Sequence, residues 1–314
     1  MSEVTPNENT SLVASLGLPL AELLHEAEGS VSLSLLYRGK LPDSPRVFLV
    51  RVRNEKPCAV VLCSPEAAPQ IVGRAMQRAL ECQQQAGTAL GRRILQPLAQ
   101  GHIAGCTYAV LPYCYQLSDF RPLWYLQRHL LRPALSEWLV QLAKVTVVAP
   151  TSPQLEARFE KPLAALATLD AASGRLRTAA RSAVNRLKSG IWSPKHVLMH
   201  GDLWKGNVMV RAPLIGNADR WEDRLVLIDW AGASVDGYPV FDLVRALGAF
   251  KFNQRDARQQ LLRQCQILEC EPADVSSHLC AALAFYYAHL EEWPLPRFLQ
   301  MSEACLDTVA RAEL

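Results

Sequence analysis

The stretch HGDLWKGN at residues 200–207, followed by LIDW at residues 227–230, decides how this chain is predicted to fold. Each stretch stands at the end of an apolar run that is typical of a short buried strand. The polar residues that follow these runs include Asp202, Asn207 and Asp229. Because a strand end can turn a side chain into a cleft while its neighbours stay buried, we expect these oxygen-bearing groups to share one site.

Composition and charge narrow the class of protein. The chain has 314 residues, of which 50% are hydrophobic and 20% charged, enough for one large core or two smaller ones. A net charge of +3 with scattered arginines gives no case for a nucleic-acid partner. No apolar run reaches the roughly 18 residues that a membrane span needs. Since the start of the chain lacks a secretory signal pattern, we expect a cytoplasmic protein.

The cysteines and histidines do not predict a zinc site. The nine cysteines are dispersed without a CxxC pair, so they are expected to act as small buried apolar residues, as at Cys58, Cys63, Cys82, Cys106 and Cys280. His196 and His200 are four residues apart. On a strand that spacing separates them by about 13 Å, which is too far to share one metal ion.

Hydrophobic periodicity divides the chain into three parts. Residues 1–28 form an extension with one short helix, in the segment LPLAELLHEA. Residues 29–115 contain three short strand patterns, a helix pattern from about Ala67 to Gln85, and two further strand patterns. Residues 116–314 are mostly helical, except for the β-type runs around the site. The prediction is an α+β protein with a small antiparallel β lobe before a larger helical lobe.

The three polar residues suit phosphoryl transfer. That reaction needs a metal ion to hold phosphate oxygens and a carboxylate near the attacking hydroxyl. Asp202 is placed to orient the hydroxyl and accept its proton, and Asn207 and Asp229 to ligate Mg²⁺, which prefers hard oxygen ligands. The simpler interpretation makes Asp202 an ordinary turn residue after Gly201.

Three motifs in order carry a resemblance to a known family. HGDLWKGN, LIDW and then GYPVFDL at residues 237–243 resemble the aminoglycoside phosphotransferase and fructosamine kinase group of the protein-kinase-like fold. The protein-kinase signature has the same form, with HRDLxxxN and DFG in these places. The match covers residues 195–247, about a sixth of the chain. It implies a two-lobed fold, ATP as co-substrate, Mg²⁺, and a small-molecule or glycan acceptor.

The resemblance also implies roles for residues of this chain. Asp202 becomes the catalytic base, Asn207 and Asp229 the ligands of the metal that holds the nucleotide, and His200 a brace for the loop. Asp242 becomes a structural carboxylate, and its alternative is a plain charge at a helix N-terminus.

Two further roles stay open. Lys205 either contacts the γ-phosphate as a catalytic residue or is simply solvated. Trp204 and Trp230 are packing residues or, flanking the cleft, platforms for a sugar.

One element of the kinase pattern is missing. A kinase has a lysine on the third strand that pairs with the α- and β-phosphates and with a glutamate on the next helix. Here that strand reads AVVLC, with Val61 or Cys63 where the lysine should be, and the helix offers Gln77 or Glu81. A glycine-rich phosphate loop is also absent, since the stretch EGSVS at residues 28–32 contains the single Gly29.

Two explanations follow from that vacancy. In the first, another residue supplies the nucleotide-binding cation: Arg51 or Arg53, which strand alternation puts on one face, or else Arg38, Lys40 or Arg74. In the second, the small lobe does not bind nucleotide in the usual way, and the protein is a weak kinase, uses another donor, or is a pseudokinase that binds nucleotide or acts as a scaffold.

The function predicted from the sequence is a cytoplasmic, bacterial-type phosphotransferase. It moves the γ-phosphoryl group of ATP, with Mg²⁺, to a hydroxyl of a sugar, amino sugar, glycated amine or choline-like acceptor. Candidates for the acceptor wall are Glu291, Glu292 and Trp293, which a solvated helix end also explains. A metal hydrolase built on His200 and Asp202 would need ligands that the spacing does not offer.

Overall fold

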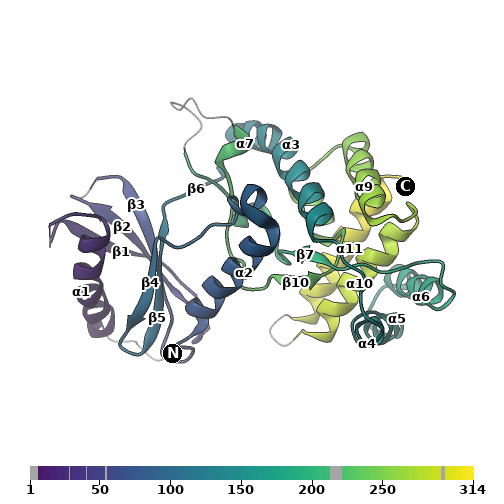
Figure 1. The fold of residues 1–314 in the computed structure, drawn as a ribbon, viewed down its shortest axis with the longest axis horizontal. Coiled ribbons are helices and arrows are strands. Elements are labelled where there is room, and N and C mark those ends of the chain that lie inside the picture. The colour runs from purple at the N-terminus through teal and green to yellow at the C-terminus, as the bar shows by residue number, and fades with distance from the viewer. Residues whose placement is uncertain (1–5, 28, 40, 54, 213–220, 291–293) are drawn as a thin grey trace.

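The computed structural model describes residues 6–27, 29–39, 41–53, 55–212, 221–290 and 294–314. Along the long axis of the molecule, a β-rich N-terminal part lies beside a mostly helical C-terminal part (Figure 1). The predicted α+β architecture with a small β lobe before a larger helical lobe is confirmed. The exact boundaries predicted at residues 28 and 115 stay a prediction.

The N-terminal lobe is built on one antiparallel sheet. Its strand order is β1-β2-β3-β5-β4, so β1 pairs with β2 and β2 with β3, while β3 pairs with β5 and β4 lies at the edge. Residues rich in valine and leucine with turn segments between them favour this meander. The strands are β1 Val31–Arg38, β2 Arg46–Val52, β3 Pro57–Cys63, β4 Ala99–Ile103 and β5 Cys106–Pro112.

Helix α1, Pro6–Leu23, covers one face of this sheet, on the side away from the helical lobe (Figure 1). Leu16 and Leu20 of α1 are buried at 0% and 1% exposure in a cluster with sheet residues that include Val61 and Cys63. Helix α1 is longer than the short helix predicted for residues 1–28.

Helix α2, Ile71–Gly91, packs on the opposite face, where the Gly73 N–H donates to Thr107 Oγ1 at 3.0 Å. Thr107 shares its face of β5 with Ala109 and Leu111, because alternate residues of a strand point the same way. These two residues pair with Leu62 and Val60 of β3.

The position on β3 that corresponds to the kinase lysine therefore differs from the predicted one. Val61 and Cys63 point toward α1, while Val60 and Leu62 are the β3 side chains on the α2 face. The predicted position is wrong by one residue, because the sequence does not reveal which face of the sheet an extra N-terminal helix covers. The conclusion that this strand offers no lysine is unchanged.

The helical lobe surrounds α10, whose side chains are buried on every side from Leu279 to Ala284. A helix that is apolar all round is buried in the core, and the sequence AALAFYYA has that character. The helices are α3 Arg121–Thr146, α4 Ser152–Leu155, α5 Lys161–Ala167, α6 Gly174–Lys188, α7 Trp221–Arg224, α8 Phe241–Ala249, α9 Gln254–Leu268, α10 Asp274–Ala288 and α11 Leu295–Arg311, with a π-helical turn at Glu156–Glu160 and a 3₁₀ turn at Lys205–Asn207.

Short strands between the two parts position the motifs HGDLWKGN and LIDW. In the first small sheet β8 pairs with β6 and β9, and in the second β7 pairs with β10. The pairing of Val208 with Leu227 brings the end of HGDLWKGN next to the beginning of IDW. These strands are β6 Tyr115–Gln116, β7 Val197–Met199, β8 Val208–Val210, β9 Leu225–Leu227 and β10 Ser234–Gly237.

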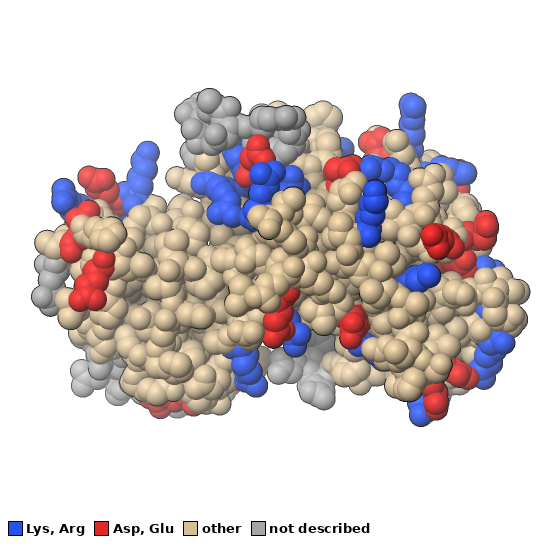
Figure 2. All heavy atoms as spheres, in the orientation of Figure 1, with Lys and Arg blue, Asp and Glu red and all other residues tan. Residues whose placement is uncertain are grey.

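Surface charge and cysteine chemistry agree with the composition. Lysine, arginine, aspartate and glutamate are interspersed over the face shown in Figure 2.

All nine cysteines are unpaired. Cys63, Cys82 and Cys280 are buried as predicted. Cys58 is exposed and Cys106 is half-buried, in contrast to the burial predicted for them. Within the described residues, no helix is both long enough and apolar enough to cross a bilayer.

Candidate active site

The loop after β7 brings Asp202 and Asn207 into direct contact. The Asn207 side-chain amide donates to the Asp202 carbonyl oxygen at 2.8 Å and to its carboxylate Oδ2 at 3.1 Å. Asn207 is buried, and Asp202 is half-buried with an accessible carboxylate. Because the nitrogen of the amide is used to hold Asp202, its oxygen is the atom left to ligate a cation.

Asp229 stands beside this pair in a strained backbone conformation. The Ile228 N–H donates to the Asn207 carbonyl at 3.1 Å, which fixes the chain one residue before Asp229. Asp229 has a φ of +63°, a left-handed conformation that costs free energy in a non-glycine residue. Its carboxylate reaches solvent, but burial by surrounding protein raises its pKa, the negative charge of Asp202 raises it further, and a hydrogen bond from the Ala231 backbone lowers it. The three residues that the sequence singled out therefore converge.

His200 braces the loop from the interior. Its Nε2 lies 2.9 Å from the Ile228 carbonyl, and the Asp202 N–H donates to its Nδ1 at 3.3 Å. These two contacts assign the neutral tautomer with the proton on Nε2. The ring also packs on Trp230 at 4.6 Å between centroids, so Trp230, 3% exposed, is a packing residue.

Asp242 at the start of α8 holds the same loop by its backbone. Its two carboxylate oxygens accept from the His200 N–H at 2.6 Å and the Gly201 N–H at 3.0 Å. Burial raises the pKa of Asp242, and the hydrogen bonds from these two N–H groups and the charge of Arg245 oppose that shift. The open choice between a structural carboxylate and a plain helix-end charge is thus decided by two direct hydrogen bonds to the loop.

Gly201 needs to be glycine for two reasons. Its φ is +87°, and a Cβ there would lie 2.7 Å from the Tyr286 hydroxyl and 3.0 Å from the Gly232 carbonyl oxygen. The Tyr286 hydroxyl, from α10, donates to the Gly201 carbonyl at 2.7 Å. Sequence reasoning missed Tyr286, because within AFYYA it has only the pattern of a core helix.

Lys205 ties the loop to the chain that links the two lobes. Its ammonium donates to the Ser118 carbonyl at 2.9 Å and pairs with Asp119 at 2.6 Å, while lying 4.9 Å from the centre of the Trp124 ring. In this arrangement the ammonium holds the loop in place. A contact of Lys205 with a γ-phosphate stays a prediction.

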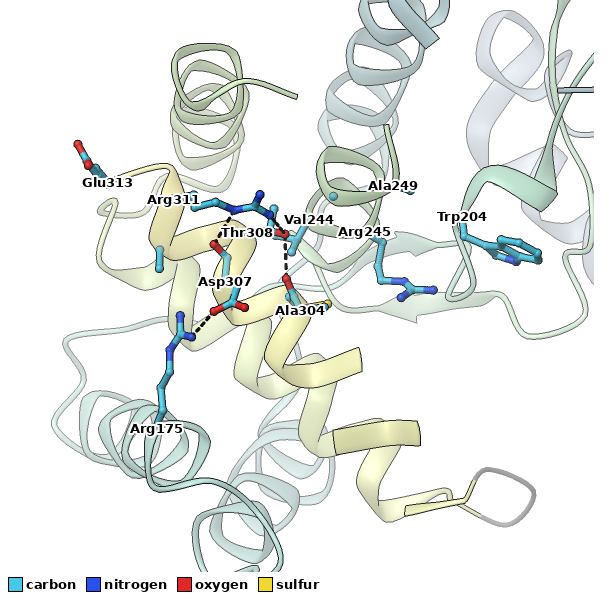
Figure 3. Close-up of a pocket in the computed structure, with 13 residues that line it drawn as sticks. Arg175, Trp204, Val244, Arg245, Ala249, Ala304, Asp307, Thr308, Arg311 and Glu313 are labelled. Carbon is cyan, nitrogen blue, oxygen red and sulfur yellow. Dashed lines mark hydrogen bonds and ion pairs between the residues drawn. The ribbon is translucent and has the colours of Figure 1, made fainter. Parts of the chain in front are cut away.

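A pocket of about 1060 Å³ lies next to the loop, between α8 and α11 (Figure 3). Trp204 and Arg245 line it on the side of the loop, and Arg245 Nη2 is 3.6 Å from Asp202 Oδ1. Arg245 was missed by sequence reasoning, since it is one of many dispersed arginines. Glu291, Glu292 and Trp293, the acceptor-wall candidates from the sequence, lie outside the described residues.

Among the described residues, no group of three or more histidine, cysteine, aspartate or glutamate side chains is arranged to hold a metal ion. His196 is buried with its Nδ1 3.2 Å from the Gly237 carbonyl, so it is a core histidine. Mg²⁺ does not need a full protein cage, because it keeps waters and uses substrate phosphates as ligands. Asn207 and Asp229 fit that requirement.

Comparison with known proteins decides the family. The model of the phosphotransferase enzyme family matches residues 44–274, well over half of the chain. The chain belongs to the phosphotransferase enzyme family. The predicted resemblance and the enzyme class of phosphotransferase are confirmed. No curated protein sequence matches this phosphotransferase significantly.

Solved structures of two relatives share the kinase-like fold. A thermostable mutant of aminoglycoside phosphotransferase APH(4)-Ia, in complex with AMP-PNP and hygromycin B, is 14% identical with a TM-score of 0.53, over 95% of this chain and 98% of that chain. A protein of Haemophilus somnus 129PT assigned as a fructosamine-3-kinase is 12% identical with a TM-score of 0.50, over 94% of this chain and 97% of that chain. The predicted two-lobed protein-kinase-like fold is confirmed.

The phosphotransferase departs from the kinase pattern in its N-terminal lobe. Arg51 donates to Ser34 Oγ at 2.9 Å on the sheet face that carries Val60. Arg53 lies beyond the end of β2, has a φ of +50°, and pairs with Glu26 at 3.1 Å. The prediction that alternation puts both arginines on one strand face is wrong, because β2 ends at Val52. The partners of these two arginines in the described part of the chain, Ser34 and Glu26, do not belong to the loop at residues 200–207.

The other candidate groups on this side are also spread out. Arg38 and Arg74 are exposed, and Lys40 lies outside the described residues. Glu81 on α2 pairs with Arg78 at 3.1 Å and accepts from Gln77 at 3.3 Å, in place of a lysine on β3.

Proposed function

We propose that this phosphotransferase transfers the γ-phosphoryl group of ATP, with Mg²⁺, to a hydroxyl group of a small molecule or glycan. The observation that carries the proposal is the convergence of Asp202, Asn207 and Asp229 at one point, with Asn207 bonded to the Asp202 carboxylate at 3.1 Å. ATP as the donor is supported by the AMP-PNP bound in the aminoglycoside phosphotransferase relative.

Asn207 and Asp229 are proposed to hold Mg²⁺. Two carboxylates, Asp202 and Asp229, repel each other in partly buried surroundings, and a divalent cation would relieve that repulsion. When bound, the ion would neutralise charge on the phosphate oxygens. Its remaining ligands would be waters and phosphate oxygens.

Asp202 is proposed to act on the acceptor. It orients the acceptor hydroxyl and takes its proton as the hydroxyl oxygen forms a bond to the γ-phosphorus. The bond between that phosphorus and the bridging oxygen breaks, and ADP leaves with the electron pair. Asp202 is held for this role by Asn207, and its backbone N–H is fixed on His200.

Arg51 is the better supported of the two cations predicted for the nucleotide. It lies on the sheet face that carries Val60, whereas Arg53 is engaged with Glu26. A contact of Arg51 with phosphate would replace a hydrogen bond to the uncharged hydroxyl of Ser34 by one to an anionic oxygen, in which donor and acceptor carry opposite charges. The nine unpaired cysteines support a reducing compartment such as the cytoplasm.

The test is ADP release from Mg-ATP over a panel of hydroxylated acceptors. Asp202→Asn is expected to lower turnover by roughly 10² to 10⁴, the usual contribution of a positioned general base. The matched control is Asp170→Asn, whose side chain is fully exposed and whose turnover should equal that of the wild type. Turnover that survives Asp202→Asn removes Asp202 from the role of base.

The second candidate is a nucleotide-binding pseudokinase. The observation that favours it is the apolar pair Val60 and Leu62 where β3 faces α2. The two candidates differ in one result. A pseudokinase would bind Mg-ATP without releasing ADP on any acceptor.

A further inference from the structure

The pocket beside the loop has more arginines than carboxylates in its lining. Its lining includes Arg175, Arg245 and Arg311 (Figure 3). Arg175 is neutralised, because it pairs with Asp307 at 2.5 Å and lies 4.0 Å from Glu303. The remaining charged groups of the lining are Arg245, Arg311 and the carboxylate of Glu313, and Glu313 lies at the end of the pocket opposite Arg245 (Figure 3).

Arg245 is the arginine nearest to the reacting groups. It extends from α8, its side chain is 22% exposed, and its Nη2 lies 3.6 Å from Asp202 Oδ1. Its Nε–H is buried, with no hydrogen-bond partner among the residues that the structure describes. A buried donor without an acceptor costs free energy. A guanidinium presents its N–H groups in a fork that fits a carboxylate or phosphate.

Arg311 adds a second cation on the α11 wall. Its Nε donates to the Asp307 carbonyl at 3.2 Å and its Nη2 to Thr308 Oγ1 at 3.3 Å. Both acceptors are uncharged, so these contacts leave the positive charge of Arg311 uncompensated within the described part of the chain.

Trp204 provides a flat apolar surface on the same side as Arg245. Its side chain is 48% exposed, and its ring lies against Gly206, where a Cβ would stand 2.5 Å from the ring. A tryptophan held in this way offers a face on which the C–H groups of a sugar ring can pack. Figure 3 shows Trp204 and Arg245 at the same end of the pocket.

We propose that the acceptor is an anionic hydroxylated compound, a sugar acid or sugar phosphate, whose anionic group is bound by Arg245 while its ring packs on Trp204. This inference rests on the proposed function, since it places the acceptor hydroxyl at Asp202. In the structure, Arg245 pairs with Asp202 at 3.6 Å. An anionic group bound to Arg245 would replace Asp202 as its partner, and the Asp202 carboxylate would then be available to accept the proton of the hydroxyl. An ammonium group at this position would be repelled by Arg245.

The test compares acceptors that share one ring. Hexose, hexosamine, hexuronic acid and hexose phosphate are titrated into the full chain with Mg-ADP, and binding is measured by calorimetry. Both anionic sugars are expected to bind more tightly than the hexose, and the hexosamine more weakly. Arg245→Gln should weaken binding of the anionic sugars roughly ten- to hundred-fold, the value of a charged hydrogen bond. The ratio of the affinity for the anionic sugars to the affinity for the hexose should then fall toward one.

Two further variants separate recognition from a structural role. Arg245→Lys keeps the charge but not the fork, and should restore part of the preference. Arg255→Gln, an exposed residue of α9, should leave the preference at the wild-type value. If Arg245 only braces Asp202, Arg245→Gln would leave the binding preference for anionic over neutral sugar unchanged, and the proposal would be overturned.

The two proposals fail in different ways. Absence of any Mg-ATP binding would remove the proposed phosphoryl transfer, while sugar binding measured without nucleotide would still test the pocket. Equal binding of hexose and the anionic sugars by wild-type protein, or preference for hexosamine, would overturn the anionic-acceptor proposal even if Mg-ATP binds.

Discussion

His278 of α10 is buried as a neutral imidazole. It accepts a hydrogen bond from Trp192 Nε1 at its Nε2, 3.2 Å away, and its Nδ1 has no partner among the described residues. Burial lowers the pKa of His278 from 6.5 to about 3; Asp274 opposes the shift and Lys195 adds to it. Protonation would place a charge in the core and cost the hydrogen bond from Trp192.

The stability of the protein should therefore fall in mild acid. Between pH 6.5 and about 3 the unfolded chain binds a proton at His278 that the folded chain does not, so a falling pH favours unfolding. This residue should account for a loss of about 2 kcal/mol between pH 7 and pH 5. His278→Gln, which keeps an acceptor for Trp192, should remove that part of the pH dependence in urea unfolding. The control is His129→Gln, at an exposed position, which should keep the wild-type change of unfolding free energy with pH. If His278→Gln also keeps that change, the prediction is contradicted.

At the residue scale, the sequence predicted the groups that lie inside short motifs. Asp202, Asn207 and Asp229 belong to two such motifs, and strand pairing brings the motifs together. Arg245 and Tyr286 reach the same loop from α8 and α10. Their positions depend on how two helices pack, which no local pattern of the sequence encodes.

At the element scale, helix α1 completes the core of the small lobe by covering one face of its sheet. Leu16 and Leu20 fill the sheet face opposite α2, so α1 is part of the core of this lobe. Leu16→Ala should lower the free energy of unfolding by about 2 to 5 kcal/mol, as for other buried leucines. Leu18→Ala, on the same helix but 51% exposed, should change it by no more than about 0.5 kcal/mol. Urea unfolding of the two variants checks this, and equal effects would mean that α1 is not a core element.

Strand and helix identities were predictable because their periodicities differ, whereas sheet faces were not. A half-buried strand such as β3 alternates, but alternation does not say which set of side chains faces which helix. The sequence therefore named Val61 for the vacant lysine position, and packing of α1 assigns that position to Val60 or Leu62. Helix α2 extends beyond the predicted end, because the chain leaves helical geometry only at Gly87, with φ +73°, and resumes to Gly91.

At the scale of the whole molecule, the two lobes are joined close to the site. The Leu95 N–H donates to the Leu227 carbonyl at 3.1 Å, and Gln85 Nε2 donates to the Val235 carbonyl at 3.3 Å. Lys205 and Asp119 add a contact between the loop and the linking chain at 2.6 Å. A ligand that touches Asp229 from the side of the sheet would therefore add contacts between elements of both lobes.

Mg-ATP should then stabilise the whole chain against thermal unfolding. At about a hundred times its dissociation constant, a ligand that binds only the folded state adds roughly 2.7 kcal/mol. Removing Mg²⁺ with a chelator should remove most of the shift, because the phosphates would face Asp202 and Asp229 without a cation between them. Asp229→Asn should abolish the Mg²⁺-dependent part while leaving the free protein no less stable than wild type, since burial disfavours the ionised carboxylate. Asp170→Asn should respond like wild type. An equal shift with and without Mg²⁺, or a full shift in Asp229→Asn, would show that the nucleotide binds without this site.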